Sequence, residues 1–274
     1  MAGVSFDNLR ACLEMEETSP GTFTGANLAL DYHRVFGGQI LAQGILAATA
    51  AADGKEVKSL TQLFPREGNA EHPMVYTVNK HQEGRTFAST TVVATQVDEA
   101  GREKTVSVAT LSMHAAEEGS VRQDDAPSVG KPDAAVETDL GMIPWETRVV
   151  DGIDLSDRSV GPASYQFWMR TPSLPDTPAL HQAMLAYATD LTVIGTALRP
   201  AEGLSQADTM TKFHSAVTSH SLWFHQPLRT DDWLLVDQHS PILAGGRAYG
   251  RGDVWSLDGR LVASFAQESM IRML

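Results

Sequence analysis

The chain has 274 residues, of which 42% are apolar and 20% are charged, values typical of a globular protein with room for two domains. Its formal net charge of −13 disfavours binding to nucleic acid or to an anionic membrane surface, because like charges repel. No apolar run reaches the ~18 residues of a membrane-spanning helix, and the first residues lack the features of a secretion signal. We therefore expect a soluble, cytoplasmic protein, and the single cysteine, Cys12, fits a reducing compartment.

One helix and several strands are predicted in the first half of the chain. Residues 38–52 are rich in alanine, follow Gly37 directly and predict a helix. Strand-like segments bounded by turn residues follow at 61–65, 74–78, 86–95 and 105–113. This order predicts a long helix followed by a mostly antiparallel meander.

The middle of the chain differs in composition from both flanks. Residues 117–141 are acidic, rich in proline, glycine and serine, and have no apolar period, which predicts a linker. We therefore expect an N-terminal module at 1–116, a linker region at 117–155 and a C-terminal module at 156–274.

The second half repeats the order of the first. Residues 179–193 predict a helix, whose Leu180, Met184, Tyr187 and Leu191 recur on one face as an apolar stripe. Strand-like segments follow at 215–225, 233–237, 248–256 and 260–270.

Fixed offsets between the halves indicate a duplication. Residues 84–87 fall on 246–249, which lie 162 positions later, and Pro65 falls on Pro227 at the same offset. After the next predicted hairpin turn of each half, residues 108–113 align with residues 265–270, and this alignment places Thr110 at the position of Gln267. Both helices are too apolar to face water, so a curved sheet has to wrap around each of them. This is the plan of the hotdog fold, and we predict an α+β double hotdog of two such repeats.

Asp190 is the first candidate for a catalytic residue. It lies near the C-terminal end of the second predicted helix, about 80° from the centre of the apolar stripe and therefore at the border of the buried face. A carboxylate at such a border is costly unless it is hydrogen-bonded, and it can act as a general base. The alternative is a structural carboxylate that bonds the local backbone or is partly exposed.

Gln267 is the second candidate. Side chains alternate between the two faces of a strand, so Gln267 faces inward if Leu261 and Phe265 do. An inward amide needs hydrogen-bond partners, and it could hold a water molecule beside a carboxylate. The alternative is an amide that satisfies the backbone of a loop.

Two other patterns carry little functional information. His214 and His220 would share one face of a strand and His225 would not, so the three do not predict a metal site. The glycine-rich residues 245–252 lead into a strand and not into a helix, so they do not predict a phosphate-binding loop.

Six segments together resemble a known family. They are RVFGGQ at 34–39, FPREG at 64–68, QFWMR at 166–170, LAYATD at 185–190, HSLWFH at 220–225 and LVASFAQE at 261–268. They resemble the acyl-CoA thioesterase II family, the TesB-like double hotdog enzymes. The resemblance implies hydrolysis of fatty acyl-CoA to free fatty acid and coenzyme A, with no metal or organic cofactor. It also implies a homo-oligomer, either a dimer or a tetramer.

The same resemblance implies an active site of an Asp, a Gln and a Thr or Ser that orient the attacking water. Asp190 and Gln267 match the first two, whereas the hydroxyl position falls on Val217 and the neighbouring Thr218 is one residue out of register. A one-residue shift turns a strand side chain to the other face. Either a β-bulge brings Thr218 inward, or the protein works without that hydroxyl.

The resemblance leaves ligand contacts and two alternative functions open. The coenzyme phosphates would need basic side chains, and the candidates are Arg66, Arg85, Arg247 and Arg251. The missing hydroxyl would fit a non-catalytic or weakly active paralogue that binds acyl-CoA. A double hotdog enoyl-CoA hydratase would need a histidine close to Asp190 on the helix, and residues 191–195 contain none.

Overall fold

The computed structural model of the chain describes residues 4–30 and 33–274. The first three residues, at the start of the segment in which we expect no secretion signal, lie outside the described residues. The chain divides into two compact units. Unit 1 contains the residues up to Val121 together with Gly141–Pro144 and Pro175–Ala188, and unit 2 contains Arg122–Leu140, Trp145–Leu174 and Thr189–Leu274.

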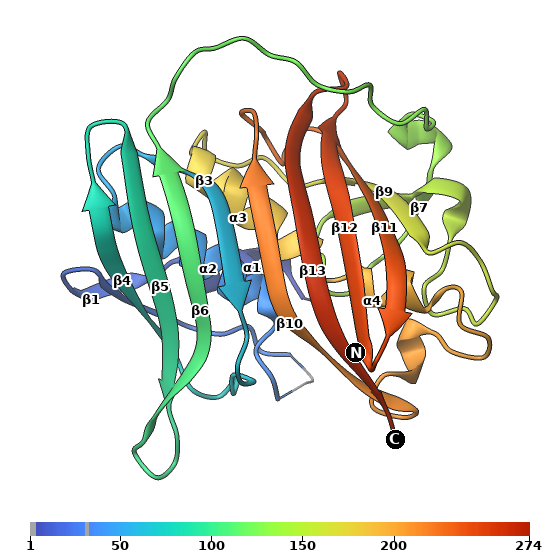
Figure 1. Cartoon of the computed structure of the whole chain (residues 1–274), viewed down its shortest axis with the longest axis horizontal. Coiled ribbons are helices and arrows are strands. Elements are labelled where there is room, and N and C mark those ends of the chain that lie inside the picture. The colour runs from blue at the N-terminus through green and yellow to red at the C-terminus, as the bar shows by residue number, and fades with distance from the viewer. Residues whose placement is uncertain (1–3, 31–32) are drawn as a thin grey trace. The chain divides into compact units, whose positions relative to one another are not determined.

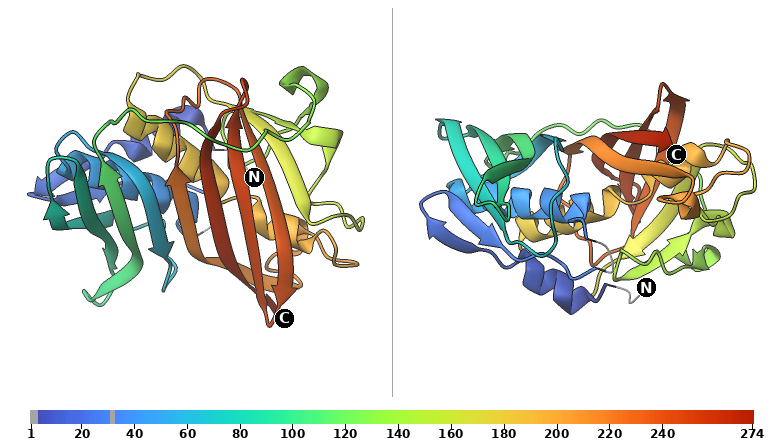
Figure 2. Two further views of the ribbon diagram at one scale, coloured as in Figure 1. Left: turned by 45° about the horizontal axis from the view of Figure 1, so that its top comes forward. Right: turned by 90° about the horizontal axis from the view of Figure 1, so that it is seen from below.

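Unit 1 is an antiparallel sheet curled around one helix. In spatial order its strands are β1 (Glu16–Ser19), β2 (Thr22–Gly25), β4 (Met74–Glu83), β5 (Phe87–Val97), β6 (Glu103–His114) and β3 (Glu56–Leu63). Strands β4, β5, β6 and β3 stand side by side in Figure 1, and Figure 2 shows the sheet curving around α2 (Gly37–Ala51). The predicted helix and the four predicted strands of the first half are confirmed, with boundaries that differ by a few residues.

Close packing inside unit 1 depends on a glycine near the start of α2. A Cβ added at Gly38 would lie 2.4 Å from the carbonyl oxygen of Tyr187, so no side chain fits there. Tyr187 belongs to α3 (Pro178–Thr189), and its ring meets that of Phe36 edge to face at 5.0 Å. The Gln182 amide of α3 also donates to the carbonyl of Val57, over 2.8 Å. These contacts join α3 to α2 and to β3.

Unit 2 contains a second antiparallel sheet with the same strand order. Its strands are β10 (Phe213–Phe224), β13 (Leu261–Met273), β12 (Arg247–Ser256), β11 (Leu234–Ala244), β9 (Ser164–Arg170), β8 (Glu146–Val149) and β7 (Val136–Glu137). The order β10-β13-β12-β11-β9-β8 corresponds to β3-β6-β5-β4-β2-β1 of unit 1. The shared order supports the predicted duplication, and the four predicted strands of the second half are confirmed as β10 to β13 (Figure 1).

The predicted helix over 179–193 is wrong at its C-terminal end. Helix α3 ends at Thr189, and a separate short helix, α4 (Val193–Leu198), packs on β11 and β12. The Thr192 hydroxyl donates to the Gln238 amide oxygen over 3.0 Å, a tertiary contact that helical periodicity cannot reveal. Residues 181–190 are all buried, so α3 is covered on every side and does not carry the predicted one-sided stripe. Asp190 lies in the turn that follows α3.

The predicted linker has little regular structure but is held in place. From 115 to 131 it contains neither helix nor strand, and a 3-10 turn at Pro132–Ala134 and strand β7 follow. The side chain of Gln123 donates to the carbonyl of Gly259 and accepts from the amide of Leu261. The linker therefore packs on the sheet of unit 2 from about this point onward.

None of the described helices has the length and apolar composition needed to cross a bilayer.

Candidate active site

Asp190 lies in a buried turn beside a histidine. Only 4% of the residue is exposed, and its Oδ1 lies 3.9 Å from Nδ1 of His220, which is fully buried on β10. The two residues are 30 positions apart in the sequence, and the end of α3 and strand β10 bring them together. This pair is the centre of the candidate site.

The hydrogen bonds of His220 define its tautomer. Its Nδ1 lies 3.0 Å from the amide oxygen of Gln267, and its Nε2 lies 3.1 Å from the hydroxyl of Thr189. An amide oxygen only accepts, so Nδ1 carries the hydrogen, and Nε2 of a neutral ring then accepts from Thr189. Burial lowers the pKa of His220 from 6.5 to about 4, partly opposed by the hydrogen bond to Gln267. His220 is therefore a neutral imidazole at physiological pH.

Gln267 faces the interior of unit 2, as the strand alternation predicts. It is 1% exposed and lies directly opposite His220 on one side and Gly250 on the other. Its amide nitrogen donates to the hydroxyl of Ser269 over 3.0 Å. Because Oε1 accepts from His220 and Nε2 donates to Ser269, both ends of the amide are held in place.

His220, Thr189 and Ser269 are residues that sequence reasoning did not place in the site. The alternation of the buried Leu222 and Phe224 with less buried residues marks the inner face of β10 and would have assigned His220 to it. The ring of Phe265 stacks on His220, with centroids 5.9 Å apart and planes at 7°. This stacking fixes the plane of the imidazole.

A β-bulge in β10 changes which side chains share a face. The pairing with β13 passes from Val217–Ser269 to Ser219–Glu268, so Thr218 is the extra residue. The prediction that His214 and His220 share a face is therefore wrong, because the bulge inserts one residue between them.

The bulge does not turn the Thr218 hydroxyl inward. This hydroxyl lies 3.0 Å from the carbonyl oxygen of Glu268 and 3.2 Å from its carboxylate. Glu268 alternates with the inward Gln267, so Thr218 belongs to the outer face. Val217 lies opposite the buried Ser269 and belongs to the inner face.

Two glycines allow close packing of the inner face. A Cβ at Gly250 would lie 2.4 Å from Cγ1 of Val193, and a Cβ at Gly252 would lie 2.5 Å from Cζ of Phe265. Gly250 is the cross-strand neighbour of Gln267, and Val193 comes three residues after Asp190. The absence of a side chain at Gly250 therefore lets the segment after Asp190 approach the strand that pairs with Gln267.

The two halves of the chain match the two domains of one enzyme family. The acyl-CoA thioesterase N-terminal domain matches residues 29–114, and the acyl-CoA thioesterase C-terminal domain matches residues 119–271. The chain belongs to the acyl-CoA thioesterase family. These matches confirm the predicted family and enzyme class, a thioester hydrolase, while the exact module boundaries remain a prediction.

Individual relatives agree with this assignment over nearly the whole chain. Acyl-CoA thioesterase 2 of Haemophilus influenzae is 29% identical, with 97% of each chain covered. Human acyl-coenzyme A thioesterase 8 is 26% identical, with 95% of this chain and 88% of that protein covered. The solved tesB protein of Mycobacterium avium subspecies paratuberculosis is 30% identical, with a TM-score of 0.83 and 97% and 99% of the two chains covered. A hot dog fold protein of Alicyclobacillus acidocaldarius has a TM-score of 0.75 at 20% identity, with 96% and 97% covered, and supports the predicted double hotdog.

Of the basic residues considered for coenzyme binding, the two in unit 2 of this thioesterase do not face the Asp190 cluster. Arg247 and Arg251 alternate along β12 with the inward Ala248 and Gly250, so they belong to the outer face. Arg247 lies 3.2 Å from the carboxylate of Glu268 on the same face. Arg66 and Arg85 are exposed residues of unit 1.

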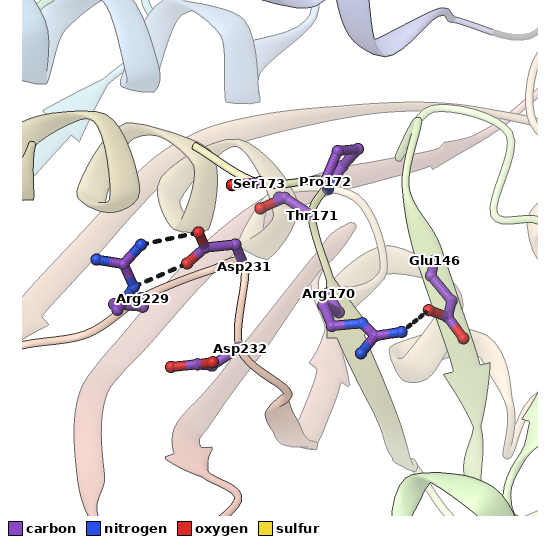
Figure 3. Close-up of a pocket in the computed structure, with 8 residues that line it drawn as sticks. All are labelled: Glu146, Arg170, Thr171, Pro172, Ser173, Arg229, Asp231 and Asp232. Atoms are coloured by element: carbon purple, nitrogen blue, oxygen red, sulfur yellow. Dashed lines mark hydrogen bonds and ion pairs between the residues drawn. The ribbon is translucent and has the colours of Figure 1, made fainter. Parts of the chain in front are cut away.

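Unit 2 has a surface pocket of about 530 Å³ whose lining includes no residue of the Asp190 cluster. Its lining residues, drawn in Figure 3, are Glu146, Arg170, Thr171, Pro172, Ser173, Arg229, Asp231 and Asp232. Arg170 pairs with Glu146 at 2.7 Å, and Arg229 pairs with Asp231 at 2.9 Å. Both arginines already face carboxylates, and with Asp232 the lining has three carboxylates against two guanidinium groups, so the pocket does not favour an anionic ligand.

The inferred equivalence of Thr110 and Gln267 is wrong. Thr110 is exposed, whereas Gln267 is buried. In unit 1, Met113 of β6 lies opposite Ala88 of β5. In unit 2, Gln267 of β13 lies opposite Gly250 of the corresponding strand, β12. The buried position that carries an amide in the second repeat therefore carries a methionine in the first.

Among the described residues, no group of three or more His, Cys, Asp or Glu side chains is arranged to hold a metal ion.

Proposed function

We propose that this thioesterase hydrolyses fatty acyl-CoA to a free fatty acid and coenzyme A, using a water molecule activated by Asp190 and held by Gln267. The observation that carries the proposal is the buried Asp190–His220–Gln267 cluster, in a chain whose halves match the two domains of acyl-CoA thioesterases. A Haemophilus influenzae relative along the full length bears the name acyl-CoA thioesterase 2, which supports acyl-CoA as the substrate.

Asp190 is the proposed general base. Water attacks the thioester carbonyl carbon, and the carboxylate takes one proton from that water as the new C–O bond forms. The tetrahedral intermediate then breaks its C–S bond, and coenzyme A leaves as a thiolate that recovers the proton. A carboxylate suits this role here because it lies in a buried turn, shielded from bulk water.

His220 is a positioning residue in this mechanism. Its Nδ1–H is donated to Gln267 and its Nε2 accepts from Thr189, so neither nitrogen is free to take a proton from water. Burial also holds its pKa near 4, far below that of a base suited to neutral pH. The assignment of the base therefore falls on Asp190.

Gln267 is the proposed water-holding residue. Its Oε1 has two lone pairs, of which the hydrogen bond from His220 uses one. The second lone pair accepts a hydrogen from the attacking water. Because the amide is held at both ends, the water is aligned before the reaction begins, which lowers the entropic part of the barrier.

The proposal is tested with Asp190→Asn, which keeps the size of the side chain and removes the base. We expect release of free thiol from a medium-chain acyl-CoA to fall between about 100- and 10,000-fold, with an unchanged melting temperature. The matched control is Asp237→Asn, a half-buried carboxyl of β11 that accepts from Gln166 on the outer face and lies outside the cluster. Undiminished turnover in Asp190→Asn would overturn the assignment.

Tight acyl-CoA binding by the wild type with no thiol release would favour the non-catalytic paralogue. A substrate series from acetyl- to palmitoyl-CoA would define the preferred acyl chain length.

An enoyl-CoA hydratase is the second candidate. The sequence lacks a histidine just after Asp190, but β10 supplies His220, whose Nδ1 lies 3.9 Å from the carboxylate. Hydration by this Asp–His pair would require His220 to give up its hydrogen bond to Gln267 or to Thr189. The assay is the loss of enoyl absorbance on addition of crotonyl-CoA. Hydration faster than thiol release would favour the hydratase.

We also infer that the protein is cytoplasmic and forms a homo-oligomer, either a dimer or a tetramer, as the family resemblance implies. Light scattering coupled to size-exclusion chromatography measures the oligomer directly. A monomeric mass at micromolar concentration would contradict this inference.

A further inference from the structure

A buried serine lies next to Gln267 on the same face of β13. Ser269 is 0% exposed and follows Gln267 by two residues, so both side chains point inward. Its cross-strand neighbours are Val217 on β10 and Ala248 on β12, which are both apolar. A hydroxyl surrounded by such neighbours is costly to bury unless its hydrogen-bonding capacity is used.

The hydrogen bonds of Ser269 leave its own hydrogen available. The Gln267 amide nitrogen donates to Ser269 Oγ over 3.0 Å, so the hydroxyl acts there as an acceptor. A serine hydroxyl also has one hydrogen to donate. In the described part of the chain no group accepts that hydrogen. Ser269 is therefore a fully buried donor, one hydrogen bond away from the amide of the Asp190 cluster.

We propose that Ser269 is a further catalytic residue, whose hydroxyl donates to the attacking water. It would supply from β13 the hydroxyl that the family resemblance places at Val217 on β10. This inference rests on the proposed hydrolysis of acyl-CoA, which it deepens by naming a third group at the reacting water.

The four hydrogen-bonding directions of a water molecule fit this assignment. The water donates one hydrogen to Asp190 and the other to Oε1 of Gln267, and it accepts from the Ser269 hydroxyl. One lone pair is then left to form the bond to the thioester carbon. As that bond forms, one proton passes to Asp190, and the C–S bond breaks in the following step with release of the thiolate.

Strand pairing explains why a hydroxyl on β13 can take the role that the family resemblance assigns to one on β10. Val217 and Ser269 are directly opposite, and such pairs hold their Cβ atoms about 5 Å apart on the same face. A hydroxyl on either strand therefore reaches the same region of the inner face. Thr218 does not, because its hydroxyl bonds Glu268 on the outer face.

The test removes the hydroxyl and then returns it on the opposite strand. Ser269→Ala should lower kcat on the order of 100-fold, the loss that a misplacement of a reacting group by about 1 Å can cause, and leave KM within about twofold. The double variant Ser269→Ala with Val217→Thr should have a kcat at least tenfold higher than that of Ser269→Ala alone. Ser240→Ala is the matched control, because it removes another buried hydroxyl, which donates to the carbonyl of Tyr249.

Each outcome has a defined meaning. A Ser269→Ala variant as active as the wild type overturns the inference while the proposed function stands, provided that Asp190→Asn is inactive. A loss of kcat that is not restored by Val217→Thr and that accompanies a lowered melting temperature also overturns it, because Ser269 would then be only structural. A wild-type protein that releases no thiol from any acyl-CoA overturns both. Loss in Ser269→Ala with rescue by Val217→Thr supports the inference.

Discussion

The Nδ1 hydrogen of His220 is donated to the amide oxygen of Gln267 over 3.0 Å, and this bond decides which end of the amide faces Ser269. An amide has one end that accepts and one that donates, so its orientation determines what it can offer to water. The bond from Thr189 to Nε2 fixes the same tautomer from the opposite side of the ring. The hydrogen-bond chain from Thr189 through His220 and Gln267 to Ser269 therefore has a single direction.

Substitutions of His220 should separate hydrogen-bond donation from ring packing. In His220→Asn the side-chain amide can still donate to Gln267 from a position close to that of Nδ1, whereas His220→Leu fills the space without a donor. We expect His220→Leu to lower kcat by about 10- to 100-fold with little change in KM, because a misoriented Gln267 affects the transition state more than binding. His220→Asn should retain most of the activity. Steady-state kinetics of thiol release measure both, and equal losses in the two variants would contradict a positioning role.

Thr218→Val should leave activity unchanged. The Thr218 hydroxyl bonds Glu268 on the outer face, and valine keeps the branched shape at the bulge. We expect kcat and KM within about twofold of the wild type, since surface substitutions away from special features are usually near neutral. A large loss of kcat would mean that Thr218 supplies the hydroxyl at the reacting water and would count against Ser269.

The sequence predicts the sheets better than it predicts the site. Alternation assigns Gln267 to the inner face correctly because β13 itself carries no extra residue between Phe265 and Ser269. The same alternation fails for His214 and His220 because the bulge at Thr218 adds one residue between them. A bulge depends on the pairing of two strands, and no pattern within one strand reveals it.

The contacts that define the candidate site are tertiary. Nothing in the sequence connects Asp190 with His220, and Thr192, which follows the end of α3 at Thr189, donates to Gln238, 46 positions later. Similarly, the sequence offset aligns Thr110 with Gln267, whereas strand pairing aligns Met113 with Gln267. The offset fails because turns and bulges add residues without changing the strand order. A fixed residue offset therefore aligns equivalent positions of the two repeats before a hairpin turn, but it can misalign them after that turn.

The buried neutral His220 should make the protein less stable as the solution becomes acidic. The folded-state pKa of about 4 lies below the ordinary value of 6.5, so between these pH values the unfolded chain binds a proton that the folded protein does not. The free energy of unfolding then rises with pH across this window, by on the order of 3 kcal/mol in total, and is constant with respect to this group above it.

Urea unfolding of the wild type and His220→Asn at pH 4.5, 5.5, 6.5 and 7.5 measures this term. The difference in unfolding free energy between the two proteins should grow from pH 4.5 to 6.5 and then level off. Parallel pH dependences would show that His220 is protonated in the folded state or is not the source of the effect. His225, whose pKa is also lowered by burial, is present in both proteins and cancels in the difference.

A side chain at Gly250 should move the segment that follows Asp190. A Cβ there would lie 2.4 Å from Cγ1 of Val193, a separation at which one of the two must shift. We expect Gly250→Ala to destabilise the fold by about 1–3 kcal/mol, as overpacked cores do, and to lower kcat by more than about tenfold through displacement of Asp190. Adding Val193→Ala removes the clashing methyl and should recover both quantities, measured by urea unfolding and thiol release. Gly119→Ala is the control, because a Cβ at that exposed position meets no atom within 4 Å. If Val193→Ala restores stability but not kcat, Gly250 affects the site by a route other than the clash with Val193.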